Sequence, residues 1–287
     1  MKLIITGGNG QLGMSLRELL ESREDIDATF IDIEDLDLTN RNDVCQYFKK
    51  YHCDILVNCA AYTAVDKAES EIDKAESVNI KAVRNIAEAA VDNSFKIIHI
   101  STDYVFDGEK ESAYEETDIP NPKTIYGKTK LEGEKILLSI LPEAIIIRTA
   151  WLYSLYGKNF FLTMKGKAMR RETARVVDDQ IGSPTNAEDL ACTIIQIIYS
   201  KDWKSGIFHF SNLGETTWFD FTREIYKLYG ADENLISPIK TSELNSPAQR
   251  PKYSILDKTK IKKTYKIEIP FWEESIKKIV TKDLTQI

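Results

Sequence analysis

Short apolar runs alternate with longer stretches along the first half of the chain. The apolar runs are of strand length and cover residues 3–6, 28–32, 54–59, 95–101 and 144–148. Runs without polar alternation are typical of strands that are covered on both faces. The stretches between them repeat apolar positions every three or four residues, as amphipathic helices do, at residues 12–20, 43–51, 74–91 and 125–141. Strand and helix therefore alternate, which predicts an α/β fold with right-handed crossovers and a doubly wound parallel sheet.

The pattern loosens beyond about residue 150. Fewer elements are recognisable there, namely a loop, two helices and a strand at residues 151–159, 160–170, 187–199 and 207–210. Prolines interrupt the remainder of the chain, and we find neither repeats nor a low-complexity linker. We therefore expect a large domain in residues 1–150, to which later segments return, and a smaller carboxy-terminal lobe formed mainly by residues 151–287. The cleft between them is the natural place for a ligand.

Composition and charge exclude several classes of protein. Of the 287 residues, 43% are hydrophobic and 29% are charged, which is ordinary for a globular protein. The net charge of −7 argues against a nucleic-acid partner, because such a partner needs clustered cations. No apolar run approaches the roughly 20 residues of a membrane span and the amino terminus lacks a signal-peptide core, so we expect a cytoplasmic protein. The 4 cysteines and 3 histidines show no spacing that suggests a metal site or a disulfide framework.

A glycine-rich loop follows the first expected strand and leads directly into a helix. The sequence TGGNGQLG places Gly7, Gly10 and Gly13 at three-residue intervals. Glycine permits the sharp turn, the approach of backbone to a phosphate and the packing of helix on strand, while the helix terminus offers N–H donors. We therefore expect this loop, with Gln11 and Leu12, to bind a dinucleotide, which makes residues 1–150 the dinucleotide-binding domain of a Rossmann-like fold. A purely structural turn is the competing interpretation.

An acidic cluster at the end of the second expected strand bears on which dinucleotide is bound. Asp32 lies 19 residues after Gly13, where a carboxylate can accept hydrogen bonds from both hydroxyls of the adenosine ribose. Asp37 and Leu38 belong to the loop that follows, and no basic residue appears before Arg41. A 2′-phosphate would be repelled by this loop, so of NADH and NADPH we expect NADH to be preferred. The alternative is a solvated acidic loop.

Tyr126 and Lys130 are four residues apart on an expected helix and therefore share one face. An ammonium group near a tyrosine favours the phenolate, which would bring the phenol proton closer to use at neutral pH. The spacing alone is weak, but Thr102 lies at the carboxyl end of the fourth expected strand, and ligands of doubly wound sheets bind outside those strand ends. We expect the three side chains to meet a carbonyl group that accepts hydride from a nicotinamide. A half-buried tyrosine and a threonine that caps a turn are the alternative.

Longer blocks of sequence resemble the extended short-chain dehydrogenase/reductases, and among them most of all the dTDP-4-dehydrorhamnose reductase family. The resemblance runs nearly from end to end. Beyond the glycine loop and the Tyr-x-x-x-Lys pair, it rests on the blocks NCAAYTAVDKAE (58–69), STDYVFDG (101–108), RTAWLY (148–153), DQIGSPT (179–185) and RPKYSILD (250–257). Blocks of this length are far more specific than either short motif.

The resemblance implies roles for particular residues. Thr102 and Tyr126 would hydrogen-bond the C4 carbonyl of a sugar, with Tyr126 giving the proton, and Lys130 would hold the nicotinamide ribose. The loop after the third strand would line the cofactor through Ala60, Ala61 and Tyr62, with Asn79 bracing it. The nucleotide-sugar substrate would be contacted by Val105, Trp151, Asn159 and Arg250. For Arg250, placed at the diphosphate by the resemblance, a surface ion pair is the competing interpretation.

The implied activity is reduction of the C4 ketone of dTDP-4-dehydro-L-rhamnose to dTDP-L-rhamnose by NADH or NADPH. One alternative is another nucleotide-sugar reductase, dehydratase or epimerase, although dehydratases of this type carry Thr-Asp-Glu where this chain has Tyr104 in third place. A second alternative is a cofactor-binding regulatory subunit that turns nothing over. Members with a metal-bridged dimer carry a glutamate where this chain has Ser15, so we expect no metal and leave a homodimer open.

Overall fold

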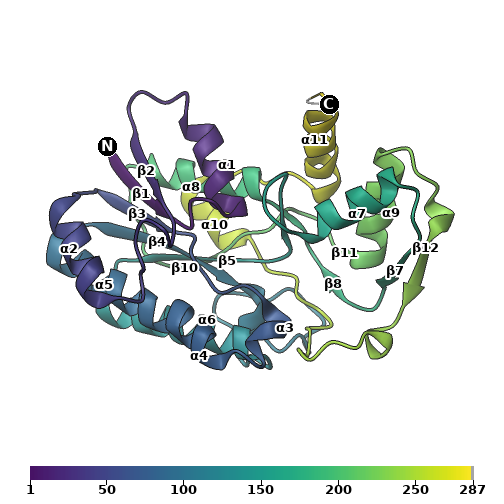
Figure 1. Ribbon diagram of the computed structural model, residues 1–287, viewed down its shortest axis with the longest axis horizontal. Helices are drawn as coiled ribbons and strands as arrows, with labels where there is room; N and C mark the ends of the chain where they lie inside the picture. The colour runs from purple at the N-terminus through teal and green to yellow at the C-terminus, as the bar shows by residue number, and fades with distance from the viewer. Residues whose placement is uncertain (286–287) are drawn as a thin grey trace.

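The computed structural model describes residues 1–285, and its centre is a parallel sheet of six strands in the order β10-β5-β4-β3-β1-β2 (Figure 1). These strands are β1 (Lys2–Thr6), β2 (Asp27–Ile31), β3 (Ile55–Asn58), β4 (Lys96–Thr102), β5 (Ile145–Thr149) and β10 (Gly206–His209). All five neighbouring pairs are parallel. The predicted doubly wound sheet is therefore confirmed. The chain builds outward from β1 in both directions, which creates a switch point between β1 and β3.

Helices cover both faces of the sheet (Figure 1). One face is packed by α1 (Gln11–Leu20), α8 (Ala187–Ile198) and α10 (Thr259–Tyr265), and the other by α2 (Arg41–Lys50), α5 (Ala82–Asn93) and α6 (Ile125–Ile140). Successive strand residues supply the two cores in turn, so that Ile5 and Val57 face the first helix layer while Ile4 and Leu56 face the second. Each fully buried aliphatic side chain stabilises the fold by about 1.5–3 kcal/mol. This double burial explains why the strands show no polar alternation.

The helix expected at residues 74–91 is divided into three parts. It consists of α4 (Ile72–Glu76), a π-helical segment η1 (Ser77–Lys81) and α5. The wider turn contains Asn79, which is 1% exposed. A π-helical turn inside a helix commonly accompanies a functional site, because the extra residue redirects a side chain. Periodicity alone did not reveal this irregularity.

A second lobe lies beside the carboxyl ends of the strands (Figure 1). Its elements are α7 (Phe160–Met169), β7 (Ala174–Val177), α9 (Trp218–Leu228), β12 (Ile236–Ile239) and α11 (Trp272–Leu284), which share one hydrophobic core. Two short strand pairs, β6 (Leu152–Tyr153) with β9 (Thr185–Asn186) and β8 (Ile181–Gly182) with β11 (Thr216–Thr217), belong to the same half of the chain. Later segments do return to the main sheet as α8, β10 and α10. A functional boundary near residue 150 stays a prediction.

None of the helices within residues 1–285 combines the length and the apolar character that a bilayer crossing requires.

Candidate active site

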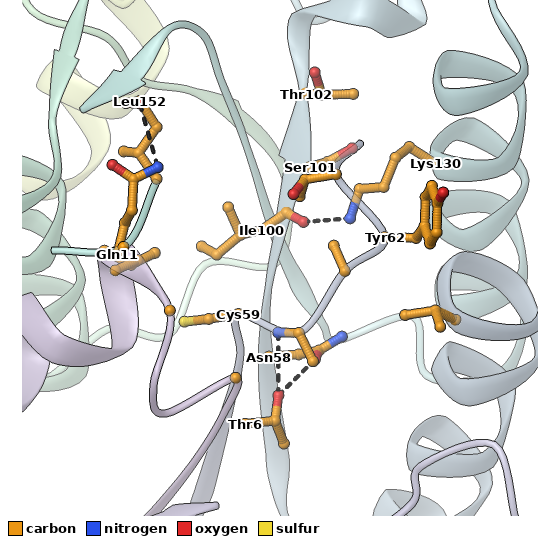
Figure 2. Close-up of a pocket in the computed structure, with 18 of the residues that line it drawn as sticks. Thr6, Gln11, Asn58, Cys59, Tyr62, Ile100, Ser101, Thr102, Lys130 and Leu152 are labelled. Carbon is orange, nitrogen blue, oxygen red and sulfur yellow. Dashed lines mark hydrogen bonds between the residues drawn. The ribbon is translucent and has the colours of Figure 1, made fainter. Parts of the chain in front are cut away.

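A cleft of about 780 Å³ runs along the carboxyl ends of the strands and continues to the second lobe. Residues expected at the cofactor and at the sugar both line it. Those among the predicted site residues are Gly7, Gly10, Gln11, Leu12, Asp32, Asp37, Leu38, Ala60, Ala61, Tyr62, Thr102, Tyr126, Lys130, Trp151 and Asn159. Figure 2 labels four of them, which come from the start of α1, the loop after β3, the end of β4 and α6, namely Gln11, Tyr62, Thr102 and Lys130. The fold therefore brings most of the predicted residues together.

The glycine loop is held tightly between β1 and β2. Gly7 has φ of +64°, a left-handed conformation that favours glycine, and the Gly8 N–H donates to the Ile31 carbonyl at 3.0 Å. A Cβ on Gly13 would lie 2.4 Å from the Gly7 carbonyl oxygen, so this residue must stay small although it does not line the cleft. No side chain caps α1 at Gly10. Its first N–H groups are therefore available to an anion at the helix terminus.

Asp32 lies at the end of β2, next to the glycine loop. Its carboxylate accepts the Asn9 N–H and the Ile33 N–H, each at 2.9 Å. A carboxylate has about four lone-pair sites, so two remain for a ligand. The side chain borders the cleft, as an acceptor for ribose hydroxyls must.

A buried row of polar side chains crosses the sheet at the strand ends. Thr6 on β1, Asn58 on β3 and His99 on β4 are partners in register. The Thr6 hydroxyl donates to Asn58 Oδ1 at 2.6 Å, and Asn58 Nδ2 lies 2.8 Å from His99 Nδ1. His99 Nε2 lies 3.4 Å from Lys130 Nζ. The same Nζ donates to the Ile100 carbonyl at 2.7 Å (Figure 2). The row thus fixes Lys130 relative to the strands that lead into both cofactor loops, and only the fold could reveal it.

The loop after β3 is braced from the helical layer. Asn79 Oδ1 accepts the Tyr62 N–H at 2.9 Å, and its Nδ2 donates to the Tyr62 carbonyl at 3.2 Å and to Thr129 Oγ1 at 3.0 Å. Asn79 does not reach the cleft itself, whereas Ala60, Ala61 and Tyr62 do. Asn79 thus braces the loop whose residues line the cleft, and their contact with a cofactor stays a prediction.

Tyr126 stands in the first turn of α6 because Thr124 caps that helix, accepting the Gly127 N–H at 3.0 Å. The phenol ring meets Tyr104 edge-on, with 5.5 Å between ring centroids. Burial raises the pKa of Tyr126, and the Thr102 hydroxyl opposes that rise. Burial is the largest influence on this pKa, and the lowering by Lys130 that the sequence suggested stays a prediction.

Lys130 is 2% exposed, and burial lowers the pKa of its ammonium to about 8 while Glu134 acts in the opposite direction. The ammonium form therefore predominates at neutral pH and is lost as the pH rises through about 8. Glu134 in turn pairs with Arg148 on β5, with 2.6 Å between Oε2 and Nη2, and accepts a hydrogen bond from Ser101. The pair joins α6 to β5, and the hydrogen bond from Ser101 joins Glu134 to β4, the strand that ends at Thr102.

Aromatic rings form the side of the cleft toward the second lobe. Trp151, with φ of +49°, stacks on Trp218 with 3.6 Å between ring centroids, and Phe160 packs on Trp218 at 4.5 Å. All three line the cleft. Sequence reasoning missed Trp218 and Phe160. A tryptophan in the first turn of a helix was the available signal, but it does not distinguish a cleft from a core.

Asn159 connects the second lobe to the glycine loop. Its Oδ1 caps α7 by accepting the Leu162 N–H at 2.9 Å, and its Nδ2 donates to Gln11 Oε1 at 2.9 Å. Gln11 also donates weakly to the Leu152 carbonyl at 3.5 Å (Figure 2). Both side chains therefore have a structural task in addition to any contact with a ligand.

Two residues expected at the substrate do not line the cleft. Val105 is 0% exposed and lies in a hydrophobic cluster with Phe106 and Leu256, because it is the last residue of the 3₁₀ turn η2 (Asp103–Val105) and that turn directs it into the core. Arg250 pairs with Asp66 at 2.6 Å and donates to the Tyr104 hydroxyl at 3.2 Å. The ion-pair interpretation thus describes Arg250 in this structure.

Within residues 1–285, no group of three or more histidine, cysteine, aspartate or glutamate side chains is arranged so that it could hold a metal ion.

Comparisons with known proteins agree with these features. The chain matches the family model described as RmlD substrate binding domain over residues 1–285. It is 42% identical over 287 residues to a dTDP-4-dehydrorhamnose reductase of Aggregatibacter actinomycetemcomitans, covering 97% of this chain and 98% of the relative. A crystal structure of a dTDP-4-dehydrorhamnose reductase from Clostridium acetobutylicum is 39% identical, with a TM-score of 0.93 and 100% of both chains covered. The Bacillus anthracis enzyme of the same name, solved in complex with NADP, is 39% identical with a TM-score of 0.94, covering 98% of this chain and 99% of that one. The chain therefore belongs to the dTDP-4-dehydrorhamnose reductase family.

Proposed function

We propose that this protein reduces the C4 ketone of dTDP-4-dehydro-L-rhamnose to dTDP-L-rhamnose with a reduced nicotinamide dinucleotide. The observation that carries the proposal is that Tyr126, Thr102 and Lys130 line the same cleft as the glycine loop. The choice of substrate is based on the similar proteins, which are named dTDP-4-dehydrorhamnose reductase.

The strand-end side of the cleft fits a dinucleotide. The backbone around Gly7 and Gly13 forms a cradle that a Cβ would fill, and the uncapped terminus of α1 suits a pyrophosphate. Asp32 keeps acceptor capacity for a ribose, and the Lys130 ammonium has a donor left for a second ribose beside its bond to Ile100. When bound, the dinucleotide supplies the hydride.

Tyr126 supplies the proton in this mechanism. Because burial raises its pKa, the phenol is protonated at neutral pH and can donate to the carbonyl oxygen. That oxygen becomes strongly basic as hydride adds to the carbon, so a weak acid suffices to protonate it. Lys130 holds positive charge near the developing anion, and the surrounding buried groups exclude water, which strengthens this stabilisation.

The test is direct. Purified protein is mixed with dTDP-4-dehydro-L-rhamnose and NADH or NADPH, and loss of the reduced cofactor is followed by absorbance while the sugar product is identified by NMR. We expect cofactor oxidation matched by formation of dTDP-L-rhamnose. If neither cofactor is consumed while the substrate is shown to be intact, the proposal is wrong.

NADH is the cofactor that the acidic loop favours. Asp32, Asp37 and their neighbours present negative charge where a 2′-phosphate would lie, and Arg41 is instead paired with Glu88 at 2.7 Å. We expect a higher kcat/KM with NADH, and a smaller preference in Asp32→Ala. The comparison of NADH with NADPH is a real test, because the similar Bacillus anthracis protein was solved in complex with NADP. Efficiency at least about tenfold better with NADPH would contradict the preference.

A further inference from the structure

Asp103 is a buried acid at the end of β4 to which the proposed mechanism gives no role. It lines the cleft and is 2% exposed. Its Oδ1 accepts a hydrogen bond from the Thr102 hydroxyl at 3.0 Å, whereas its Oδ2 is buried without a hydrogen-bond partner. An ionised carboxylate with an unsatisfied buried oxygen is costly, and such a group within a cleft calls for a physical explanation.

The neighbour of this acid, Thr102, has a restricted hydrogen-bonding capacity. A threonine hydroxyl has one proton and two lone pairs. Its oxygen accepts the Tyr104 N–H at 3.2 Å, and its proton goes to Asp103. Only one lone pair is then left for the cleft. A ketone oxygen is also an acceptor, so Thr102 in this arrangement cannot donate a hydrogen bond to the carbonyl of a substrate.

Protonation of Asp103 would remove the conflict. A carboxylic acid has an O–H donor, which can be directed at the Thr102 oxygen in place of accepting from it. The Thr102 oxygen would then accept from both Tyr104 and Asp103, and its own proton would be free to point into the cleft. Beside it, Tyr126 donates the proton that the reaction consumes, so the ketone would receive two hydrogen bonds instead of one.

We propose that Asp103 is a positioning residue whose protonation state decides whether the Thr102 hydroxyl points at the acid or at the carbonyl of the substrate. The inference rests on the proposed function, since it requires a ketone at this place. It assigns Asp103 a role through Thr102 and no direct contact with the reacting atoms.

The electrostatic surroundings support a change of protonation in an accessible range. Burial raises the pKa of Asp103 to about 6, and the hydroxyls of Ser254 and Thr102 partly oppose this rise. The titratable groups that interact electrostatically with Asp103 are Tyr126 from α6 and Tyr104 from η2. Both stay protonated because burial raises their pKa values. Charged groups lie one step further away, where Arg250 contacts Tyr104 and pairs with Asp66.

The sign of the expected effect follows from this arrangement. Below about pH 6 the acid form of Asp103 predominates and the Thr102 hydroxyl can donate to the ketone. Above that pH Asp103 is ionised, and the Thr102 hydroxyl donates its hydrogen bond to the carboxylate instead. Removing one hydrogen-bond donor to a developing oxyanion lowers kcat by roughly 10²–10³-fold. A donor that is present only part of the time should lower kcat by less. We therefore expect kcat/KM for the ketone to fall about tenfold or more as the pH rises from about 5 to about 7.5, and then to level off before Lys130 titrates.

The experiment is a pH profile of kcat and KM in wild type and four variants. D103N carries no proton to lose in this range, so the fall near pH 6 should vanish. T102S keeps the hydroxyl and should keep the fall, whereas T102V should be slow at every pH and show no fall. E116Q is the matched control, because burial also raises the pKa of Glu116 but that residue does not line the cleft. Its profile should follow wild type.

A double-variant cycle separates positioning from general structural support. If Asp103 acts through Thr102, adding D103N to T102V should cost less than about twofold further. A fall near pH 6 that persists in D103N or T102V overturns the inference while leaving the reductase activity standing. Absence of turnover in wild type at every pH overturns the proposed function instead. Should D103N not fold, the T102S and T102V profiles, with infrared detection of a carboxylic-acid band that titrates in wild type, decide the question.

Discussion

The two sides of the cleft are built from different interactions. On the strand-end side, Thr6, Asn58, His99 and Lys130 are buried and joined by hydrogen bonds across three neighbouring strands and α6. On the side of the second lobe, Trp151, Trp218 and Phe160 meet through stacked and tilted rings. Hydrogen bonds are directional and fail when one partner is removed, whereas ring packing is broad and tolerates substitution. The rate of catalysis should therefore depend mainly on the strand-end side, and the affinity for the substrate mainly on the side of the second lobe.

Among the substitutions on the two sides of the cleft, Tyr126→Phe should cause the largest loss of activity. Removing the proton donor should lower kcat by roughly 10²–10⁴-fold, because a positioned general acid contributes about that much. Dinucleotide affinity, measured by fluorescence titration, should stay within about twofold. Tyr104→Phe is the matched control, since Tyr104 packs against Tyr126 while its hydroxyl accepts a hydrogen bond from Arg250. A kcat of Tyr126→Phe within a few fold of wild type would contradict the assignment.

The buried pair beneath the strand-end side should be the most sensitive point for stability. Glu134→Gln leaves the Arg148 charge without its partner, and breaking a buried pair in this way costs about 3–5 kcal/mol. Denaturant unfolding measures the loss. For comparison, Glu243→Gln breaks a pair with Arg175 in which both side chains are about half exposed or more, and should cost no more than about 1 kcal/mol. Equal losses for the two variants would show that burial does not govern these pairs.

The glycine loop should tolerate no side chain at Gly13. The Cβ of Gly13→Ala would meet the Gly7 carbonyl oxygen at 2.4 Å and the Gly8 backbone at 2.8 Å, and backbone cannot yield as a flexible side chain does. We expect overpacking to cost about 1–3 kcal/mol and to abolish measurable dinucleotide binding in calorimetry. Gly230→Ala places a Cβ in open space at φ of +67°, so it should lower stability by about 1–2 kcal/mol and leave binding intact. Normal dinucleotide affinity in Gly13→Ala would refute the role of this loop.

The aromatic side should show the smallest effect. Trp218→Ala removes the ring that supports Trp151, and an aromatic pair contributes about 0.5–1.5 kcal/mol beyond its buried area. We expect KM for the sugar nucleotide to rise about tenfold while dinucleotide affinity changes by less than twofold, and Trp218→Phe should recover most of the loss. If dinucleotide affinity fell as much as substrate affinity did, the two sides would not be separable.

Local patterns were sufficient for the parts of the site that lie within one element. The helical period placed Tyr126 and Lys130 on one face of α6, and the strand-loop-helix context identified the glycine loop. Asp103, Tyr104 and Val105 show where such patterns fail. In a 3₁₀ turn successive side chains point about 120° apart, so a sequence does not tell which of them faces the cleft. The structure directs Asp103 and Tyr104 toward it and Val105 into the core.

The amino-acid sequence by itself determined the class of fold and indicated the glycine loop and the Thr102, Tyr126 and Lys130 set as the candidate site, because strand burial, glycine conformations and helical spacing are properties of neighbouring residues. Only the tertiary structure decided that His99 lies against Lys130, that Trp218 stacks on Trp151 and that Asp103 accepts a hydrogen bond from the Thr102 hydroxyl. The first two contacts join residues 31 and 67 positions apart, and their geometry depends on how strands register and lobes pack. The third joins neighbours in sequence, yet the burial that gives it meaning comes from segments far along the chain.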